Sequence, residues 1–269
     1  MSVHESYEVY AIRYGRSANR KRVDNFIKTD DHDSPMPIDY SIWVIRNENR
    51  TIVVDTGFDH QEAETRGRKL ERLPREALNM LDINAGKVEN VIITHLHYDH
   101  AGTLDEFPAA RFHLQEREMQ YATGRHMCSA HLSEPYTANH VCNMVKAVFD
   151  RRVKFHDGSR TLAPGIEVHH VGGHTMGVQV VRVMTKRGWV VLAGDASHFY
   201  ENFETGSPFI IAYSVAEMVD GFNTLYELAE SPQHIIPGHD PLVSMRYPAA
   251  TDHTGNIIVS LHENPLADT

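Results

Sequence analysis

The segment 91–102, VIITHLHYDHAG, constrains the fold of this chain more than any other. It begins with the apolar run Val91–Ile93, which is typical of a buried strand. Directly behind this run stand four residues that can bind metal ions: His95, His97, Asp99 and His100. If the strand continued through them, alternation would send part of the set to one face and part to the other. We therefore expect the strand to end at Thr94 and a loop to turn these side chains towards a common centre.

The residue types in this loop favour a metal site. Neutral imidazole and carboxylate are ligands that zinc, iron and manganese prefer in proteins. The spacing H-x-H-x-D-H favours two ions, because the first two histidines can serve one ion and the remaining pair another. The alternative is a polar loop with coincidental histidines, in a chain that has 19 of them. We favour the metal site, because random histidines seldom fall in this spacing behind an apolar strand.

The motif HLHYDHAG resembles the metal-binding motif of the metallo-β-lactamase superfamily, and its residue sequence is most similar to that of the N-acyl homoserine lactonase branch. The other motifs of the family are present in order: Val54-Asp55-Thr56-Gly57, Gly173-His174, Gly194-Asp195 and Pro237-Gly238-His239. The resemblance spans residues 55–239, and pattern alone predicts only an α/β fold. It implies an αβ/βα sandwich, two mixed β-sheets flanked by helices, with residues 1–269 forming a single metallo-hydrolase domain.

The resemblance also implies the ligand set. One ion would be held by His95, His97 and His174, the second by Asp99, His100 and His239, and Asp195 would bridge the two. A carboxylate has two oxygens and can bridge two cations, which a neutral histidine cannot do. Aspartate at position 195 argues against zinc β-lactamase activity, because the commonest enzymes of that kind have cysteine there. Two divalent ions, Zn²⁺ first among them, are the expected cofactors, and N/O ligand sets also accept manganese, iron or cobalt.

This ligand set predicts hydrolysis. Two cations about 4 Å apart can hold a shared water and lower its pKa towards neutrality, and the bridging hydroxide would then attack a carbonyl carbon. One cation would polarise the carbonyl oxygen and the other would accept the leaving alkoxide, which suits ester-type substrates. Asp99 is expected to carry the proton to the leaving group. We therefore expect a lactonase that opens N-acyl homoserine lactone or a related small lactone.

One position departs from the lactonase pattern. The homoserine lactonases have a tyrosine in the motif D-x-x-Y, whereas this chain reads D-A-S-H and has His198 there. An imidazole can also donate to a developing oxyanion, but its charge changes near neutral pH. We predict that His198, or Tyr200 from a shifted position, is the oxyanion donor. The departure leaves the acyl-homoserine substrate open and does not affect the metal ligands.

Three other functions share parts of the motif set. A thioester hydrolase of the glyoxalase II kind uses the same ligands, and an iron dioxygenase resembling persulfide dioxygenases uses only the first site. A metal-stabilised binding module without turnover is the third alternative. The presence of both His100 and His239 favours two ions over a single iron, and the intact ligand set favours an enzyme over a binding module.

Composition limits the partners and the location. The formal net charge of −10 disfavours a nucleic-acid partner, whose binding needs a clustered basic surface. No apolar run approaches the ~20 residues that cross a bilayer, and the first ten residues lack the features of a secretory signal. Two cysteines give no disulfide framework. We expect a cytoplasmic monomer or homodimer that acts on a small molecule, with no membrane partner.

Periodicity and turn residues predict the remaining elements. Strands are expected at 7–14, 40–46, 51–55, 88–94, 111–114, 153–156, 166–171, 178–185, 188–193 and 234–239, and helices at 60–85 (in two pieces), 116–122 and 214–229. Asp55 is expected to orient the histidine loop through hydrogen bonds, and the alternative is an aspartate that starts a turn. The polar segment 15–36 is expected to be a flap over the site, an oligomer contact or a disordered surface loop.

The segment 123–150 contains four further residues that could bind zinc: Cys128, His131, His140 and Cys142. Their spacing fits no structural zinc pattern, so we expect packing here and no third metal site. The apolar residues of this segment predict helices that either form a wall of the substrate pocket or pack on the sheet. Aromatic candidates for the pocket lining are Phe26, Tyr136, Phe199, Tyr200 and Phe203, with ordinary packing as the alternative for each.

Overall fold

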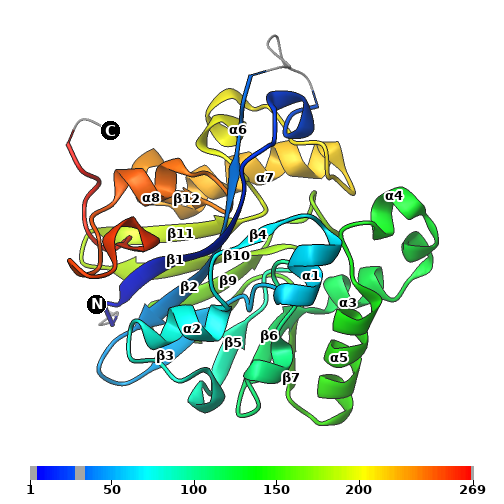
Figure 1. The fold of residues 1–269 in the computed structure, drawn as a ribbon, viewed down its shortest axis with the longest axis horizontal. Helices are drawn as coiled ribbons and strands as arrows, with labels where there is room; N and C mark the ends of the chain where they lie inside the picture. The colour runs from blue at the N-terminus through cyan, green and yellow to red at the C-terminus, as the bar shows by residue number, and fades with distance from the viewer. Residues whose placement is uncertain (1–4, 28–33, 268–269) are drawn as a thin grey trace.

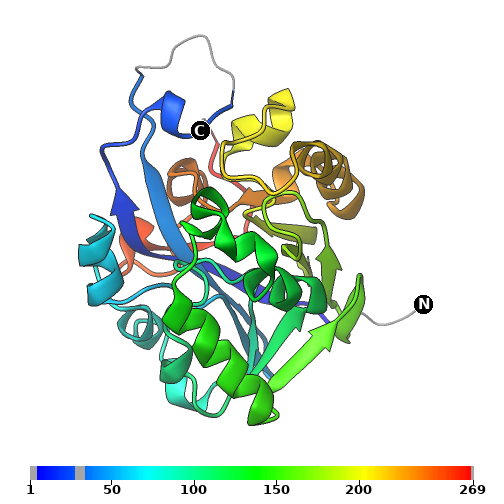
Figure 2. The ribbon, with the colours of Figure 1, turned by 90° about the vertical axis from the view of Figure 1, so that its right-hand side faces the viewer.

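Two mixed β-sheets pack face to face in this protein, with helices on both outer faces (Figures 1 and 2). The computed structural model describes residues 5–27 and 34–267. The architecture is the αβ/βα sandwich that the resemblance implied, so the expected fold is confirmed. Part of the expected flap, residues 28–33, lies outside the described residues.

The first sheet is eight-stranded, in the order β13-β1-β2-β3-β5-β6-β7, with β4 paired to β1. Its strands are β1 (Glu8–Ser17), β2 (Ile38–Arg46), β3 (Thr51–Val54), β4 (Lys69–Leu70), β5 (Asn90–Ile92), β6 (Arg111–Gln115), β7 (Val153–His156) and β13 (Ile258–Ser260). The strands β3, β5, β6 and β7 are parallel neighbours, and the other pairs are antiparallel. Parallel strands end at the same edge of a sheet. The chain that leaves β3 at Asp55 therefore lies beside the chain that leaves β5 towards the histidine loop.

The second sheet is five-stranded, in the order β12-β11-β10-β9-β8. Its strands are β8 (Arg160–Ala163), β9 (Ile166–His170), β10 (Gln179–Thr185), β11 (Gly188–Gly194) and β12 (Ile235–Pro237). The strands β11 and β12 are parallel, and Gly194 is in register with Pro237. The loops that begin with Asp195 and Gly238 therefore leave this sheet at the same edge.

Helices flank the two sheets on opposite sides. They are α1 (His60–Thr65), α2 (Pro74–Asn79), α3 (Glu116–Ala122), α4 (Ala130–Ser133), α5 (Ala138–Phe149), α6 (Tyr200–Thr205), α7 (Val215–Leu228) and α8 (Leu242–Arg246). Figure 1 shows α2, α3 and α5 on the side of the first sheet and α6, α7 and α8 on the side of the second. None of the helices within 5–27 and 34–267 is long and apolar enough to span a bilayer.

The core has two parts because the strands of the first sheet are apolar on both faces. Along β1, Tyr10 and Ile12 pack with residues of α2 and α5, whereas Val9 and Ala11 pack with the second sheet. This division follows the alternation of side chains along a strand. In the second sheet, the consecutive residues Val190–Ala193 of β11 are all buried, so that β11 also has no solvated face.

Most of the expected elements are confirmed near their expected bounds, including the β2–β3 and β10–β11 hairpins and the helices α3 and α7. Pro74 begins the second helical piece of 60–85. Proline suits this position because the N–H groups of the first helical turn have no partner within the helix. The central strand β5 ends at Ile92, earlier than expected, because the backbone N–H of Thr94 donates to the side chain of Asp55. The elements β4, β8, β13, α6 and α8 were not expected, because most of them are too short to show a period.

Candidate metal centre

Seven buried side chains meet where the two sheets end. They come from the loops after β5, β9, β11 and β12: His95, His97, Asp99, His100, His174, Asp195 and His239. Each is at most 8% exposed. The structure thus brings together every residue of the ligand set that the sequence analysis proposed. Their geometry divides them into two groups around Asp195.

The first group consists of His95, His97 and His174. The Nε2 atom of His174 lies 2.9 Å from Nδ1 of His97 and 3.2 Å from Nε2 of His95. It also lies 3.2 Å from Oδ2 of Asp195, and Nε2 of His95 lies 3.8 Å from the same oxygen. The three imidazoles and one carboxylate oxygen therefore surround one point.

The second group consists of Asp99, His100 and His239. The Nε2 atoms of His100 and His239 lie 3.2 Å and 3.0 Å from Oδ1 of Asp195. Each of these two nitrogens also lies 3.7 Å from Oδ2 of Asp99. One oxygen of Asp195 thus faces the first group and the other faces the second. This arrangement suits a carboxylate that bridges two cations.

Three of the histidines form hydrogen bonds on the side that faces away from the centre, and these bonds show that Nδ1 carries a proton. Nδ1 of His100 is 2.7 Å from Oδ2 of Asp55, and Nδ1 of His174 and of His239 are each 2.8 Å from a backbone carbonyl, those of Ile211 and Asp39. Carboxylate and carbonyl oxygens accept, so Nδ1 must donate in each ring. In the neutral form of each ring, the form that binds metals, the Nε2 atom that points to the centre then carries the lone pair.

The buried acceptor atoms that point to the centre show whether the site fits metal ions. Nε2 of His100 and Oδ1 of Asp195 are buried and have no hydrogen-bond partner among the described residues. Lone pairs packed about 3 Å apart away from water are costly unless a cation lies between them. Burial also lowers the pKa of His95 and His97 well below its usual value, which keeps both rings in the neutral form that binds metals. The ligand set fits two divalent cations.

Asp55 orients the histidine loop, as expected from the sequence. Its carboxylate accepts hydrogen bonds from the backbone N–H and the hydroxyl of Thr94 and from Nδ1 of His100. The residue is fully buried and has a φ of 63°, a left-handed conformation that aspartate tolerates better than most residues. The expectation that it fixes the loop is confirmed, and the alternative of an ordinary turn residue is wrong.

The sequence analysis missed Glu118, which supports the other half of the centre. This fully buried carboxylate of α3 accepts hydrogen bonds from the backbone N–H of Leu96 and Gly177 and from the hydroxyls of Tyr136 and Thr175. It therefore ties the loop of His97 to the loop of His174. A Cβ at position 177 would lie 2.1 Å from the backbone nitrogen of Glu118, so glycine there permits the contact. A glutamate within EREMQ looks like a solvated helix residue, so no local pattern indicates this role.

The two proposed oxyanion donors lie in different places. Nε2 of His198 is 2.9 Å from Oδ2 of Asp195, and its ring stacks on Phe209 at 3.6 Å. Burial lowers the pKa of His198 to about 3, so the ring is neutral near pH 7 and the expected change of charge does not arise. The ring of Tyr200 instead lies 3.9 Å from the guanidinium carbon of Arg246 and lines a separate surface hollow beside Leu242.

The four residues of segment 123–150 do not form a metal site. Cys128 and Cys142 are exposed free thiols, whereas His140 is buried with Nε2 3.8 Å from a carboxylate oxygen of Glu62. Within the described part of the chain, the groups that could hold a metal ion contain none of these four residues. His131 is exposed and lies at the mouth of the cleft above the centre.

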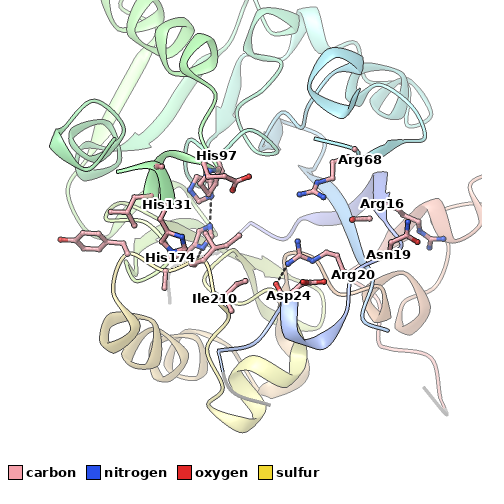
Figure 3. Close-up of a pocket in the computed structure, with 18 of the residues that line it drawn as sticks. Arg16, Asn19, Arg20, Asp24, Arg68, His97, His131, His174 and Ile210 are labelled. Carbon is pink, nitrogen blue, oxygen red and sulfur yellow. Dashed lines mark hydrogen bonds between the residues drawn. The ribbon is translucent and has the colours of Figure 1, made fainter. Parts of the chain in front are cut away.

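A cleft of about 940 Å³ leads to the centre and is lined at its base by His97 and His174 (Figure 3). The aromatic residues that line it are Tyr121 and Tyr213, which the sequence analysis did not single out. The expected aromatic residues pack elsewhere: Tyr136 against His97, Phe26 against Phe199, and Tyr200 against Phe203. For them the alternative of ordinary packing holds.

Comparison with known proteins places this geometry in a family. The chain is similar to an N-acyl homoserine lactonase of Bacillus sp (29% identity over 189 residues, 64% of this chain and 70% of the relative). It is also similar to the lactonase AiiB of Rhizobium rhizogenes (28% over 183 residues, 62% and 66%). A crystal structure of a quorum-quenching N-acyl homoserine lactone lactonase shares its fold with a TM-score of 0.75 at 22% identity, over 89% of this chain and 95% of that one.

The dizinc quorum-quenching lactonase AidC has the same fold, with a TM-score of 0.69 at 17% identity over 88% and 89% of the two chains. The family model of the metallo-beta-lactamase superfamily matches residues 36–246, which include all seven residues of the proposed ligand set. The match covers well over half of the chain. The chain therefore belongs to the metallo-β-lactamase superfamily.

Proposed function

We propose that this protein is a metal-dependent hydrolase that opens a lactone ring at a pair of divalent cations, with the whole chain acting as one domain. One observation carries the proposal: Oδ2 of Asp195 faces the first group of ligands, and Oδ1 faces the second. The relatives named above as N-acyl homoserine lactonases support an ester-type substrate. Zn²⁺ is the proposed ion, because tetrahedral sites of histidine and carboxylate suit it.

The residues around the centre have different roles in the proposed reaction. When bound, the two cations supply an activated water and polarise the substrate carbonyl. Asp195 holds the two groups of ligands at a fixed separation, and Asp55 and the carbonyl of Asp39 orient His100 and His239. Asp99 is the most exposed of the seven ligands, and we assign to its carboxylate the transfer of a proton to the leaving alkoxide.

We assign the role of the family's tyrosine to His198 and not to Tyr200. The ring of His198 lies between those of His174 and His239, with centroids 5.5 Å and 4.8 Å away. In the structure the neutral ring directs its Nε2–H to Oδ2 of Asp195. With Asp195 bound to cations, this N–H would turn from the carboxylate to a substrate oxygen. His198→Ala is expected to lower kcat by about a hundredfold. Tyr200→Phe is the matched control, and a larger loss there would overturn the assignment.

The experiment that tests the function is a pH-stat assay of the metal-quantified protein with panels of lactones and thioesters. Hydrolysis of lactones in preference to thioesters is expected, and the opposite preference would favour a thioesterase. His239→Ala should lose one metal ion and nearly all activity while the circular dichroism spectrum stays that of a folded protein. Unchanged turnover in this variant would rule out the two-metal mechanism, and a single iron per chain in the wild type would favour a dioxygenase.

The cytoplasmic location and the monomeric or homodimeric state stay predictions from the sequence, as does the absence of nucleic-acid and membrane partners. Fractionation of cells would test the location. Sedimentation of the purified protein would test the state of assembly.

A further inference from the structure

The two walls of the cleft differ in chemistry. One wall carries four cations, from β1, the segment after it, the residue before β4, and β4 itself: Arg16, Arg20, Arg68 and Lys69. The facing wall is mostly apolar and comes from Ile210–Tyr213. In Figure 3 the labelled arginines lie together across the cleft from His97, His174 and Ile210. A ligand in this cleft therefore meets the metal centre at its base, an apolar wall on one side and positive charge on the other.

The positive charge of this wall contrasts with the rest of the chain. The whole protein has a formal net charge of −10, yet the cleft has four permanent cations against two carboxylates, Asp24 and Glu134. The carboxylate of Asp24 accepts from the backbone N–H of Lys21, and that of Glu134 lies 3.4 Å from Arg66. Neither carboxylate pairs with a cation that lines the cleft. A positively charged cleft in a protein with a negative net charge attracts negatively charged ligands.

Two of the cations are held in position by neutral groups. Nε of Arg20 donates to Oδ1 of Asn25 at 2.7 Å, and a terminal nitrogen of Arg20 donates to the carbonyl of Asp24. Nε of Arg68 donates to the hydroxyl of Tyr98 at 3.2 Å. Arg16, by contrast, forms an ion pair with Asp39 at 2.8 Å.

Within 5–27 and 34–267, neither Arg20 nor Arg68 has a carboxylate within 4.0 Å of its guanidinium group. Both side chains are partly buried. With no carboxylate in direct contact, the terminal N–H groups of a partly buried guanidinium are free for a ligand, and anionic oxygens are their best acceptors.

We propose that the substrate carries an anionic group, a carboxylate or a phosphate, which Arg20 and Arg68 bind while the lactone carbonyl lies at the metal centre. This inference rests on the proposed function and specifies its substrate class. The planar guanidinium fork matches the oxygens of either group. The hydrocarbon between the anionic group and the lactone packs against Ile210 and Ile211 on the facing wall. The volume of about 940 Å³ is sufficient for both ends of such a molecule.

Matched substrates test the proposal on the metal-loaded protein. Three lactones with the same ring and the same chain length would end in a methyl group, a carboxylate or a phosphate. We expect the wild type to prefer one of the charged lactones in kcat/KM, mainly through KM, and the two charged members show which anion is bound. In the double variant Arg20→Gln/Arg68→Gln, the loss for the preferred charged lactone should exceed the loss for the methyl lactone by at least about tenfold.

The matched control is Arg75→Gln, an exposed arginine on α2 whose ion pair with Glu106 lies outside the cleft. It should change kcat/KM for the charged and uncharged lactones equally. Equal losses for all lactones in the double variant, or a wild-type preference for the methyl lactone, would overturn the proposal while lactone hydrolysis itself stands.

A binding measurement separates failure of this proposal from failure of the proposed function. The ring-opened products of the same lactones bind without turnover, and calorimetry gives their Kd values on the metal-loaded protein. Every ring-opened product carries the carboxylate that hydrolysis creates, so the products differ only in the group at the far end of the chain. We expect the product with the second anionic group to bind at least about tenfold more tightly than the methyl product in the wild type, and this difference to disappear in the double variant. A difference that persists in the double variant, or is absent from the wild type, would refute the role of the two arginines whatever the enzyme hydrolyses.

Discussion

The two halves of the metal centre are each supported by one fully buried carboxylate, and the two carboxylates act differently. Asp55 at the end of β3 bonds directly to the imidazole of His100, a ligand of the second group. Among the described residues, Glu118 of α3 accepts only from backbone N–H groups and hydroxyls: those of Leu96, Thr175 and Gly177 in the loops that carry His97 and His174, and that of Tyr136 before α5. One carboxylate thus acts on a ligand itself, and the other acts on the backbone that carries the ligands.

This difference indicates that the two carboxylates control different properties, metal affinity and stability. A carboxylate that accepts from Nδ1 of His100 fixes the tautomer and raises the basicity of Nε2, so Asp55 should control metal affinity. A carboxylate that joins two loops leaves the ligand nitrogens unchanged, so Glu118 should control stability and the spacing of the loops. Variants of the shared ligand, of Asp55 and of Glu118 would separate these roles.

The largest effect is expected where the two halves meet. Asp195→Asn keeps the shape of the side chain but removes the negative charge that both groups share. The variant should hold fewer than two ions, and it should lose several kcal/mol of transition-state stabilisation, about a thousandfold in kcat/KM. Metal analysis and steady-state kinetics would measure both quantities. A variant with two tightly bound ions and near-normal rates would show that the halves are independent.

A smaller and one-sided effect is expected for Asp55→Asn. The neutral amide cannot stabilise the ring of His100 as a carboxylate does, so the affinity for one of the two ions should fall by about 10-fold to 100-fold. Competition with a chromophoric chelator would resolve the two dissociation constants. Equal weakening of both ions would contradict the assignment of Asp55 to the second group alone.

The smallest effect on chemistry is expected for Glu118→Gln. The variant keeps one acceptor oxygen, whose two hydrogen bonds become neutral, and places an NH₂ donor where the other oxygen accepted from a backbone N–H and a hydroxyl. The lost acceptor should cost at least about 2 kcal/mol of unfolding free energy. Both metal affinities should stay close to those of the wild type. Chemical denaturation and the same chelator assay would measure the two properties. Loss of metal affinity without loss of stability would reverse the roles proposed for the two carboxylates.

The sequence was most informative where the position of a side chain depends on a short local motif. The spacing in HLHYDHAG indicated a metal site, because its residues directly follow an apolar strand. The family resemblance carried by the motifs at Gly173-His174, Gly194-Asp195 and Pro237–His239 then implied the seven proposed ligands that the structure brings together. The resemblance supplied the sandwich of mixed sheets. Asp55 was also accessible from the sequence, since it stands at the end of a strand within a family motif.

The remaining features depend on contacts between distant segments and were not accessible. Glu118 lies in a helix with no local sign of burial, and its four donors come from three other segments. The basic wall of the cleft forms because β4 pairs with β1 and brings Arg68 and Lys69 beside Arg16. A strand of two residues such as β4 has no periodicity to detect. Tyr200 and His198 are two residues apart in sequence, and the start of α6 between them separates their side chains.

The ligands of the centre come from both sheets: four follow β5 in the first, and the other three follow β9, β11 and β12 in the second. A pair of cations held by these residues would therefore crosslink the sheets at one edge of the sandwich. Binding energy at the centre is then also folding energy, because it is lost when the sheets separate. Chelation should loosen the edge that bears the active site first, and hydrogen exchange in these loops would report the metal load of the protein.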